Sequence, residues 1–284
     1  MILDLAALQT LVAAIDLNGF GKAAEHLHRT PGAVSQQLKA LEEKVGAPLF
    51  RKVGRQQVPT DAGEVLLAFA RRLLQLNDEA ALALRGLHLD GEVRFGMPQD
   101  FADSGLPQTL ATFARAHAAV RIDISVDRSA TLQTQLARGA LDLVLAFGES
   151  ADPTPPLARL PVRWFAHPEF TLQRGQPVPL LLLGNPCAFR QAAIDALDKA
   201  RRPWRIALSS GSVSAIWAAA AAGLGVTARA DVHIPDGLTC VDKAFKLPRL
   251  GNIALQLSQN RSRTNAAADH LRELVQEAVR SRLG

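Results

Sequence analysis

The chain has 284 residues, of which 48% are apolar, and carries a formal net charge of +5. This length predicts two or three compact units with hydrophobic cores, and two cysteines are too few for a disulfide-stabilised scaffold. No apolar run reaches the roughly 18 residues that a membrane-spanning helix needs, which argues against an integral membrane protein. A signal peptide carries basic residues before its apolar stretch, and the first residues of this chain carry none. We therefore expect a cytoplasmic protein.

Two short helices are predicted at the start of the chain. Asp4 can cap the first, because its carboxylate can accept hydrogen bonds from free amides, and apolar residues recur at helical spacing over residues 5–15. The Asn18-Gly19 pair ends this helix, and a second helix is expected over residues 21–27. A short turn follows at residues 28–29.

A third helix begins at the dipeptide Thr30-Pro31. The threonine can cap the helix, and a proline at the first helical position loses no hydrogen bond. Val34, Leu38, Leu41 and Val45 form one apolar stripe, which we expect to pack on the first two helices. Two helices joined by a short turn are typical of a helix-turn-helix, whose second helix enters the major groove of DNA.

The opposite face of this third helix is polar and suits base recognition. Gln36 can bond adenine in bidentate fashion, Ser35 can bond several base edges, and Lys39 can reach a guanine or a phosphate. Thr30 and the free amides at the helix start suit a phosphate oxygen. The alternative is a three-helix bundle whose polar face is only solvated.

A basic, strand-like segment follows the third helix. Residues 49–52 and 57–58 are expected to pair as a small hairpin, a wing, around residues 53–56. Arg55 at its tip could enter a narrow minor groove, and Lys22, Arg51 and Lys52 would neutralise backbone phosphates. Residues 20–60 hold seven basic and three acidic residues, so most of the net charge lies there. The candidate DNA-binding residues are Lys22, Thr30, Pro31, Gly32, Ser35, Gln36, Lys39, Arg51, Lys52 and Arg55.

A long helix is predicted over residues 61–84, capped by Thr60. Leu66, Leu73 and Ala80 recur every seven residues, and Phe69 and Leu76 form a second seven-spaced set. Such a repeat predicts a short coiled-coil seam with a partner helix. The alternative is an amphipathic helix that lies on its own domain.

After a hinge at residues 86–90, strands and helices alternate. This order predicts mostly parallel α/β packing in two lobes with a cleft between them. Strands are expected at 91–96, 120–127, 141–148, 162–167, 177–185, 204–210, 224–229 and 252–258, and helices at 106–117, 131–138, 189–199, 212–222 and 265–282.

The N-terminal segment resembles the DNA-binding domain of the LysR-type transcriptional regulators. The shared pattern is A-A-x-x-L-x-x-T-x-x-A-V-S-x-Q-L-x-x-L-E, then G-x-x-L-F-x-K and G-R-x-x-x-x-T-x-A-G. The matching residues are Ala23, Ala24, Leu27, Thr30, Ala33, Val34, Ser35, Gln37, Leu38, Leu41, Glu42, Gly46, Leu49, Phe50, Lys52, Gly54, Arg55, Thr60, Ala62 and Gly63. Residues 179–190 and 218–229 are most similar to the LrhA/HexA-like subgroup of that family.

The chain departs from this pattern at three positions. Lys52 stands where the family usually has arginine, so the bidentate fork that a specific base contact would use is lost. Pro59 replaces a usual leucine and removes one strand donor. Gly32 leaves a recognition-helix position without a side chain.

The resemblance implies an α/β chain with a winged helix-turn-helix (1–60), a dimerising linker helix (61–86) and a two-lobed effector domain of periplasmic-binding-protein type (91–284). Lobe I would comprise residues 91–160 and 260–284, and lobe II residues 161–259. It implies a DNA-binding transcriptional regulator that forms homodimers or homotetramers and whose DNA affinity or bending responds to a small effector between the lobes. The candidate effector-binding residues, at helix starts and strand ends, are Pro98, Gln99, Asp100, Ser129, Thr131, Phe147, Ser209, Ser210 and Ser212.

Other chemistries find little support in the sequence. The Gly223-Leu224-Gly225 run follows a helix and precedes a strand, which is the wrong order for a dinucleotide fingerprint. His26 and His28 lie on different faces, so we expect neither a metal site nor another cofactor. A plain solute-binding protein and an enzyme that uses the cleft remain the rival functions, and no Ser/His/Asp set or carboxylate pair favours catalysis.

Overall fold

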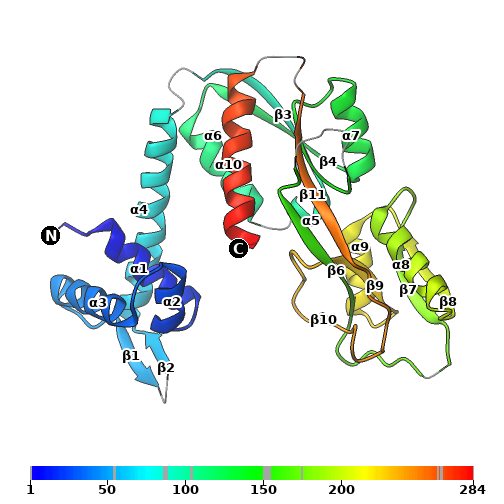
Figure 1. Cartoon of the computed structure of the whole chain (residues 1–284). Coiled ribbons are helices and arrows are strands. Elements are labelled where there is room, and N and C mark those ends of the chain that lie inside the picture. Colours follow the sequence, from blue (N-terminus) through cyan, green and yellow to red (C-terminus); the bar gives the residue numbers. More distant parts are fainter. Residues whose placement is uncertain are drawn as a thin grey trace. The chain divides into compact units, whose positions relative to one another are not determined.

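The computed structural model of the chain describes residues 2–53, 56–85, 89–102, 105–149, 155–173, 175–260, 262 and 265–283. The chain divides into two compact units, residues 1–87 and 88–284 (Figure 1). In the described part of the chain, no helix combines the length and the apolar character needed to cross a bilayer.

The first unit contains the predicted helix-turn-helix and wing. Asp4 caps its first helix by accepting from the Ala6 amide at 3.0 Å, and Thr30 caps its third by accepting from the Ala33 amide at 3.2 Å, so both caps are confirmed. The elements are α1 (Leu5–Asp16), α2 (Phe20–His26), α3 (Pro31–Val45), β1 (Phe50–Val53), β2 (Gln56–Pro59) and α4 (Asp61–Arg85).

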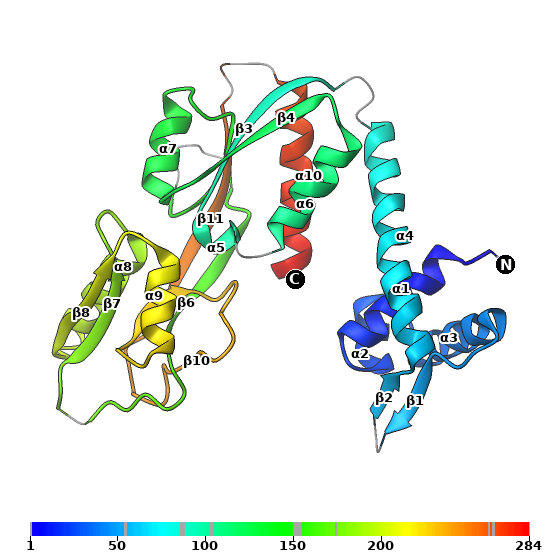
Figure 2. The same ribbon diagram turned by 180° about the vertical axis from the view of Figure 1, so that it is seen from behind.

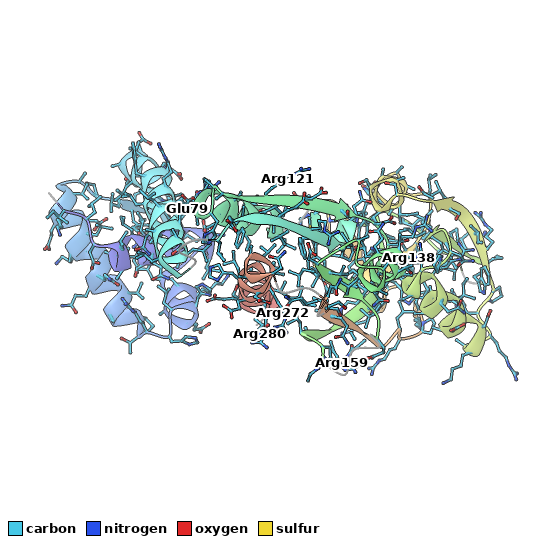
Figure 3. All side chains as sticks on the ribbon, turned by 90° about the horizontal axis from the view of Figure 1, so that it is seen from above. Glu79, Arg121, Arg138, Arg159, Arg272 and Arg280 are labelled. Atoms are coloured by element: carbon cyan, nitrogen blue, oxygen red, sulfur yellow. The ribbon has the colours of Figure 1, made fainter. Side chains whose placement is uncertain are left out.

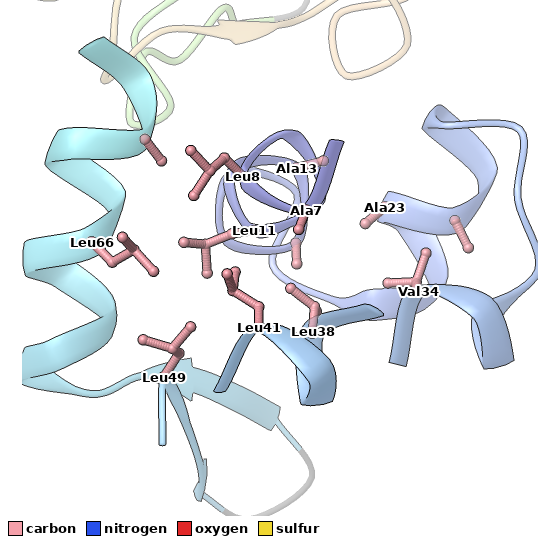
Figure 4. Close-up of a cluster of buried hydrophobic side chains, with 13 residues drawn as sticks. Ala7, Leu8, Leu11, Ala13, Ala23, Val34, Leu38, Leu41, Leu49 and Leu66 are labelled. Carbon is pink, nitrogen blue, oxygen red and sulfur yellow. The ribbon is translucent and has the colours of Figure 1, made fainter. Parts of the chain in front are cut away.

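One apolar core holds these elements together (Figure 4). Leu8 and Leu11 of α1 meet Leu38 and Leu41 of α3, and Leu66 of α4 closes the cluster; each is at most 9% exposed. At about 2 kcal/mol for each buried large side chain, this cluster dominates the stability of so small a unit. It fixes α3 by one face only and leaves the other face to solvent.

The linker helix α4 divides its apolar residues between two faces. Leu66 packs into the core of its own unit, so its assignment to the predicted seam is wrong. The other four predicted seam residues face solvent, as part of a row that recurs every three or four residues and that we call the α4 stripe. The α4 stripe consists of Val65, Phe69, Leu73, Leu76, Ala80 and Leu84. Phe69 and Leu76 are 54% and 61% exposed, which is unusual for side chains of this size.

The second unit is built on one seven-stranded sheet and a smaller two-stranded sheet (Figure 2). The large sheet has the strand order β10-β6-β11-β5-β3-β4, with β9 also paired to β6; the small sheet pairs β7 with β8. The strands are β3 (Gly91–Met97), β4 (Val120–Val126), β5 (Leu143–Phe147), β6 (Ala158–Ala166), β7 (Val178–Leu183), β8 (Trp204–Ser210), β9 (Thr227–Ala230), β10 (Thr239–Cys240) and β11 (Asn252–Gln259).

Helices cover both sheets. α6 and α10 pack side by side against the first lobe, α7 packs on β5, and α9 packs on β7 and β8. The helices are α5 (Gln99–Ala102), α6 (Leu106–Ala116), α7 (Ser129–Ala137), α8 (Ala188–Lys199), α9 (Val213–Ala221) and α10 (Ala266–Leu283). Gly223 ends α9 with a φ of +72° and donates to the Ala220 carbonyl at 3.0 Å, which confirms its role as a helix terminator.

The strand directions differ from the mostly parallel packing that the sequence predicted. Among the described strands of the second unit, the β3–β4, β3–β5 and β7–β8 pairs are parallel, whereas β6 is antiparallel to β9, β10 and β11. The antiparallel partners of β6 lie more than 50 residues farther along the chain, so no direct crossover connection sets their direction. β11 also pairs with β5 through its C-terminal half, so it joins strands of both lobes rather than belonging to lobe II alone.

Candidate functional site

The polar face of α3 is exposed along its whole first half. Val34, Leu38 and Leu41 are buried, while the side opposite them faces solvent. The exposed candidate residues of α2, the turn and α3 are Lys22, Thr30, Pro31, Gly32, Ser35, Gln36 and Lys39. The structure therefore brings these seven predicted positions to the accessible side of the helix-turn-helix.

A small polar network fixes the angle of α3. The Gln37 side-chain oxygen accepts from the Thr10 hydroxyl of α1 at 2.8 Å and from the Arg29 guanidinium of the turn at 2.5 Å. Thr10 is fully buried, so this contact ties α3 to the core. Sequence reasoning did not assign a role to Arg29 or Gln37, although Gln37 lies beside the apolar stripe and matches the family pattern.

Lys39 remains accessible to an anion. Its ammonium lies 4.0 Å from the Glu43 carboxylate one turn later, and both side chains are at least 70% exposed. An ion pair as exposed as this contributes little, so a phosphate or base can replace it at low cost.

The wing is attached to α3 through a carboxylate. Glu42 accepts from the Leu49 amide at 2.7 Å and the Phe50 amide at 3.1 Å, so it positions the start of β1. Arg51 and Lys52 of β1 are exposed, and Lys52 lies opposite Gln57 in the hairpin. Arg55 lies outside the described residues.

The wing also lies close to the start of α4. Thr60 donates from its hydroxyl to the Pro48 carbonyl at 2.7 Å and caps the Gly63 amide at 3.1 Å. A Cβ on Gly63 would lie 2.2 Å from the Leu49 carbonyl oxygen, so only glycine permits this approach. Glu42, Thr60 and Gly63 therefore fix the wing relative to α3 and α4.

A second candidate site is a cavity of about 280 Å³ in the second unit. It is lined by the C-terminal ends of β4 and β5 with the starts of α5 and α7 on one side, and by the starts of α8 and α9 with β9 on the other. Strand ends and helix starts are the usual place for ligands in such folds.

Five of the nine predicted effector-site residues line this cavity: Pro98, Gln99, Asp100, Ser129 and Phe147.

The other four, Thr131, Ser209, Ser210 and Ser212, are not among the lining residues. Ser129, Ala130 and Gln133 of α7 line the cavity, whereas Thr131 lies on another face of the same helix. The hydroxyl oxygens of Ser210 and Ser212 already form local hydrogen bonds. That of Ser210 accepts from the Ser212 amide, and that of Ser212 accepts from the Ala215 amide and so caps α9.

Polar contacts join the two sides of the cavity. The Arg229 guanidinium of β9 binds both oxygens of the Asp100 carboxylate, with Nε 3.1 Å from Oδ1, and the side chains are 4% and 7% exposed. Gln99 accepts from the Val213 amide at 2.9 Å, and Arg128 donates to the Asn185 carbonyl at 2.7 Å. All three contacts connect segments about 60 or more residues apart in the chain.

Sequence reasoning missed Gln133, Phe189 and Arg229 among the lining residues. Arg229 left an indication, because it is the one charged residue of the strand predicted at residues 224–229. Gln133 and Phe189 left none, since each lies in an unremarkable helical pattern. In the described residues, no group of three or more histidine, cysteine or acidic side chains is arranged to hold a metal ion.

Several charged side chains of the second unit are paired with one another. Arg159 and Arg121 lie at the outer surface of the second unit (Figure 3). The Arg159 guanidinium lies 3.1 Å from Glu149, and Arg121 lies 3.5 Å from Glu92. Farther inside, Arg94 forms a bidentate pair with Asp142, whose side chain is 8% exposed. The hydrogen bonds that Arg94 donates to the Asp142 carboxylate raise the pKa of Arg94 above its ordinary value.

Comparison with known proteins gives matches to both units. Residues 5–64 match the family model of the bacterial regulatory helix-turn-helix protein, lysR family, and residues 87–280 match that of the LysR substrate binding domain. The HTH-type transcriptional regulator PecT of Dickeya dadantii (strain 3937) is 34% identical over 282 residues, which cover 99% of this chain and 89% of PecT.

Two further similarities agree with these matches. The HTH-type transcriptional regulator DgdR of Burkholderia cepacia is 32% identical over 278 residues, 96% of this chain and 95% of DgdR. The crystal structure of HinK, a LysR family transcriptional regulator from Pseudomonas aeruginosa, shares the fold with a TM-score of 0.51 at 20% identity, and covers 98% of this chain and 99% of HinK. Because family models match both units and the full-length relatives are regulators, the chain belongs to the LysR family of transcriptional regulators, with a DNA-binding helix-turn-helix unit followed by a substrate-binding domain.

Proposed function

We propose that this protein regulates transcription in the cytoplasm by binding a two-fold DNA site as a dimer, under the control of a small molecule held in the cavity. The observation that carries the DNA-binding part is the exposed polar face of α3, which lies opposite the apolar stripe whose residues Val34, Leu38 and Leu41 are buried. A helix fixed in this way can enter a major groove without losing its core contacts.

Base recognition is assigned to three side chains of α3. Ser35 and Gln36 are exposed on one turn of the helix and Lys39 on the next, and all three carry the donors or acceptors that base edges require. The assignment is supported by the Gln37 network, which fixes the orientation of the helix that presents them.

Phosphate contacts are assigned to the residues around this helix. Thr30, Pro31 and Gly32 lie at its start, where free amides and the helix dipole favour a phosphate oxygen. Lys22, Arg51 and Lys52 supply positive charge, and Arg55 is proposed to enter the minor groove.

Dimerisation is assigned to the α4 stripe. A solvent-facing row with three- and four-residue spacing has the pattern of a coiled-coil seam, and large apolar side chains rarely face water without a partner. A dimer would carry two recognition helices, as a two-fold operator requires, and tetramers would be pairs of such dimers.

The cavity is assigned to the effector. It lies between two lobes that are joined by polar contacts, so a ligand there can favour one lobe arrangement over another. An effector with different affinities for two arrangements shifts their populations and thereby alters DNA affinity or bending. The relatives PecT and DgdR are named as transcriptional regulators, which favours regulation over catalysis.

The test is DNA binding by the full-length protein, measured by fluorescence anisotropy with fragments selected from genomic DNA. Affinity should fall steeply with salt, and the variants Lys39→Glu and Arg55→Glu should each bind more weakly with a smaller salt slope, by about 0.9 per lost phosphate contact. Lys199→Glu, the same charge change at the end of α8, serves as the matched control. If Lys39→Glu and Arg55→Glu bind as the parent does, the DNA-binding surface is misassigned.

A further inference from the structure

We infer that the cavity of the second unit selects an uncharged effector with an apolar body. The reason is that the guanidinium of Arg229, which an anionic effector would use, is already paired with the carboxylate of Asp100. This inference rests on the proposed effector function of the same cavity. It adds the chemical class of the ligand, which follows from how the charged residues of the lining are paired.

The charge balance of the lining disfavours an anion. Five charged side chains line the cavity, of which Asp100, Asp127 and Glu149 are acidic and Arg128 and Arg229 are basic. The lining therefore carries a formal charge of −1. A carboxylate that enters such a space loses its hydration, and the charged side chains of the lining offer no excess of positive charge to compensate.

The most buried cation of the lining is already neutralised. Arg229 binds both carboxylate oxygens of Asp100, and the two side chains are 4% and 7% exposed. The guanidinium carbon also lies 4.4 Å from the centre of the Phe189 ring, so one face of the cation is covered. An anionic ligand would have to displace Asp100 and leave that carboxylate buried without its partner, which is costly.

The second cation of the lining has a structural role. Arg128 donates to the Asn185 carbonyl on the opposite side of the cavity at 2.7 Å and is half-buried. Its chain neighbour Asp127 contributes an equal negative charge to the same lining. Glu149 is paired with Arg159, which does not line the cavity.

The remaining surface suits an apolar ring with a neutral hydrogen-bond acceptor. Phe147 and Phe189 meet edge to face with their centres 5.0 Å apart, and Val126, Leu183 and Val213 add aliphatic surface. The Nε2 amide of Gln133 is buried without a hydrogen-bond partner, although Gln133 lines the cavity. A buried donor of this kind calls for an acceptor, which a ligand carbonyl or hydroxyl would supply.

The cavity volume limits the size of this ligand. At about 280 Å³ it lies just below the range of about 300–1,000 Å³ that is usual for small-molecule sites. A single substituted ring fits that volume. Benzamide and benzoate are therefore a suitable pair of probes, since they share a ring and a size and differ in charge.

The test compares the two probes on the full-length protein by isothermal titration calorimetry and ligand-observed NMR. The parent should bind benzamide at least about tenfold more tightly than benzoate. Asp100→Asn releases the guanidinium of Arg229, so it should raise benzoate affinity at least about tenfold, the value of one charge-assisted hydrogen bond. The double variant Asp100→Asn/Arg229→Met removes that cation and should lose the gain.

A matched control separates this effect from general destabilisation. Asp142→Asn breaks another largely buried Asp–Arg pair, with Arg94, which does not line the cavity. It should lower the thermal midpoint and leave the probe preference unchanged. Gln133→Met should weaken benzamide several-fold, because the buried amide donor is then absent.

Three results would overturn the inference. They are tighter binding of benzoate than of benzamide by the parent, no gain of benzoate binding in Asp100→Asn, and no binding of either probe at millimolar concentration. DNA affinity measured on the same samples distinguishes the two proposals: a parent that binds DNA and prefers benzoate is still a regulator, but one with an anionic effector. A parent that fails to bind DNA contradicts the proposed function whatever the probes do.

Discussion

Gly63→Ala should destabilise the DNA-binding unit selectively. The new methyl group would lie 2.2 Å from the Leu49 carbonyl oxygen, whereas ordinary contacts are 3.4–4 Å, so backbone must move by about 1 Å. That oxygen also accepts from the Thr60 amide at 2.9 Å, and the displacement weakens this bond.

The size of the effect follows from three contributions. Overpacking costs about 1–3 kcal/mol and the weakened hydrogen bond about 1 kcal/mol, while alanine gains about 1 kcal/mol over glycine in a helix. The free energy of unfolding should therefore fall by about 2 kcal/mol. For a unit of fewer than 100 residues this corresponds to a thermal midpoint lower by about 10 °C. Gly32→Ala is the matched control: nothing lies within 4 Å of its added Cβ, so it should be neutral or stabilise by about 0.5–1 kcal/mol.

The three tryptophans, Trp164, Trp204 and Trp217, make the measurement specific. All of them lie in the second unit, so fluorescence follows that unit alone, while hydrogen exchange of peptides from residues 1–85 follows the first. Gly63→Ala should speed exchange in the first unit and leave the fluorescence transition in place. Parent-like exchange of α4 and the wing in Gly63→Ala would refute the steric argument.

Three further outcomes are expected. Glu42→Ala should lower the free energy of unfolding by about 2 kcal/mol and speed hydrogen exchange of the amides at the start of β1. The reason is that the half-buried carboxylate accepts hydrogen bonds from both of these amides. Phe69→Glu with Leu76→Glu should shift the dimer towards monomer in sedimentation equilibrium, whereas Leu224→Glu, at an equally exposed position of the second unit, should not. Burial, with a smaller contribution from neighbouring His270, lowers the pKa of His117 below 6.5. The folded second unit should therefore lose stability as pH falls below 6.5 towards that lowered pKa, and His117→Gln should flatten the dependence in fluorescence-monitored urea titrations.

Local patterns were sufficient to predict most elements. Thr30-Pro31 combines a cap with a fixed φ, so α3 begins where the dipeptide indicates. The strand predicted at residues 204–210 coincides with β8, since its bounds are set by a proline before it and a glycine after it. Short-range chemistry determines such boundaries, and sequence alone reveals it.

Long-range pairing was not predictable in the same way. Asp100 and Arg229 are 129 residues apart, and nothing in either local pattern identifies the other as its partner. The assignment of Leu66 to the dimer seam failed for a related reason: the heptad spacing is real, but packing on α1 decides which positions of α4 are covered. Ser209 was likewise chosen for its residue type, whereas the turn after β8 places Gly211 and Val213 on the cavity instead.

The course of β6 constrains how the two lobes can move. Its first residues, from Ala158 to Pro161, pair with β11, and its next residues, from Val162 to Phe165, pair with β9. The two lobes are thus connected by a continuous hydrogen-bonded strand rather than by a flexible linker. Rearrangement of the lobes has to proceed by twisting this strand, and a twist that preserves its ladder is small and elastic. We therefore expect ligand binding to change the angle between the lobes only slightly. The sheet should restore the original angle once the ligand leaves.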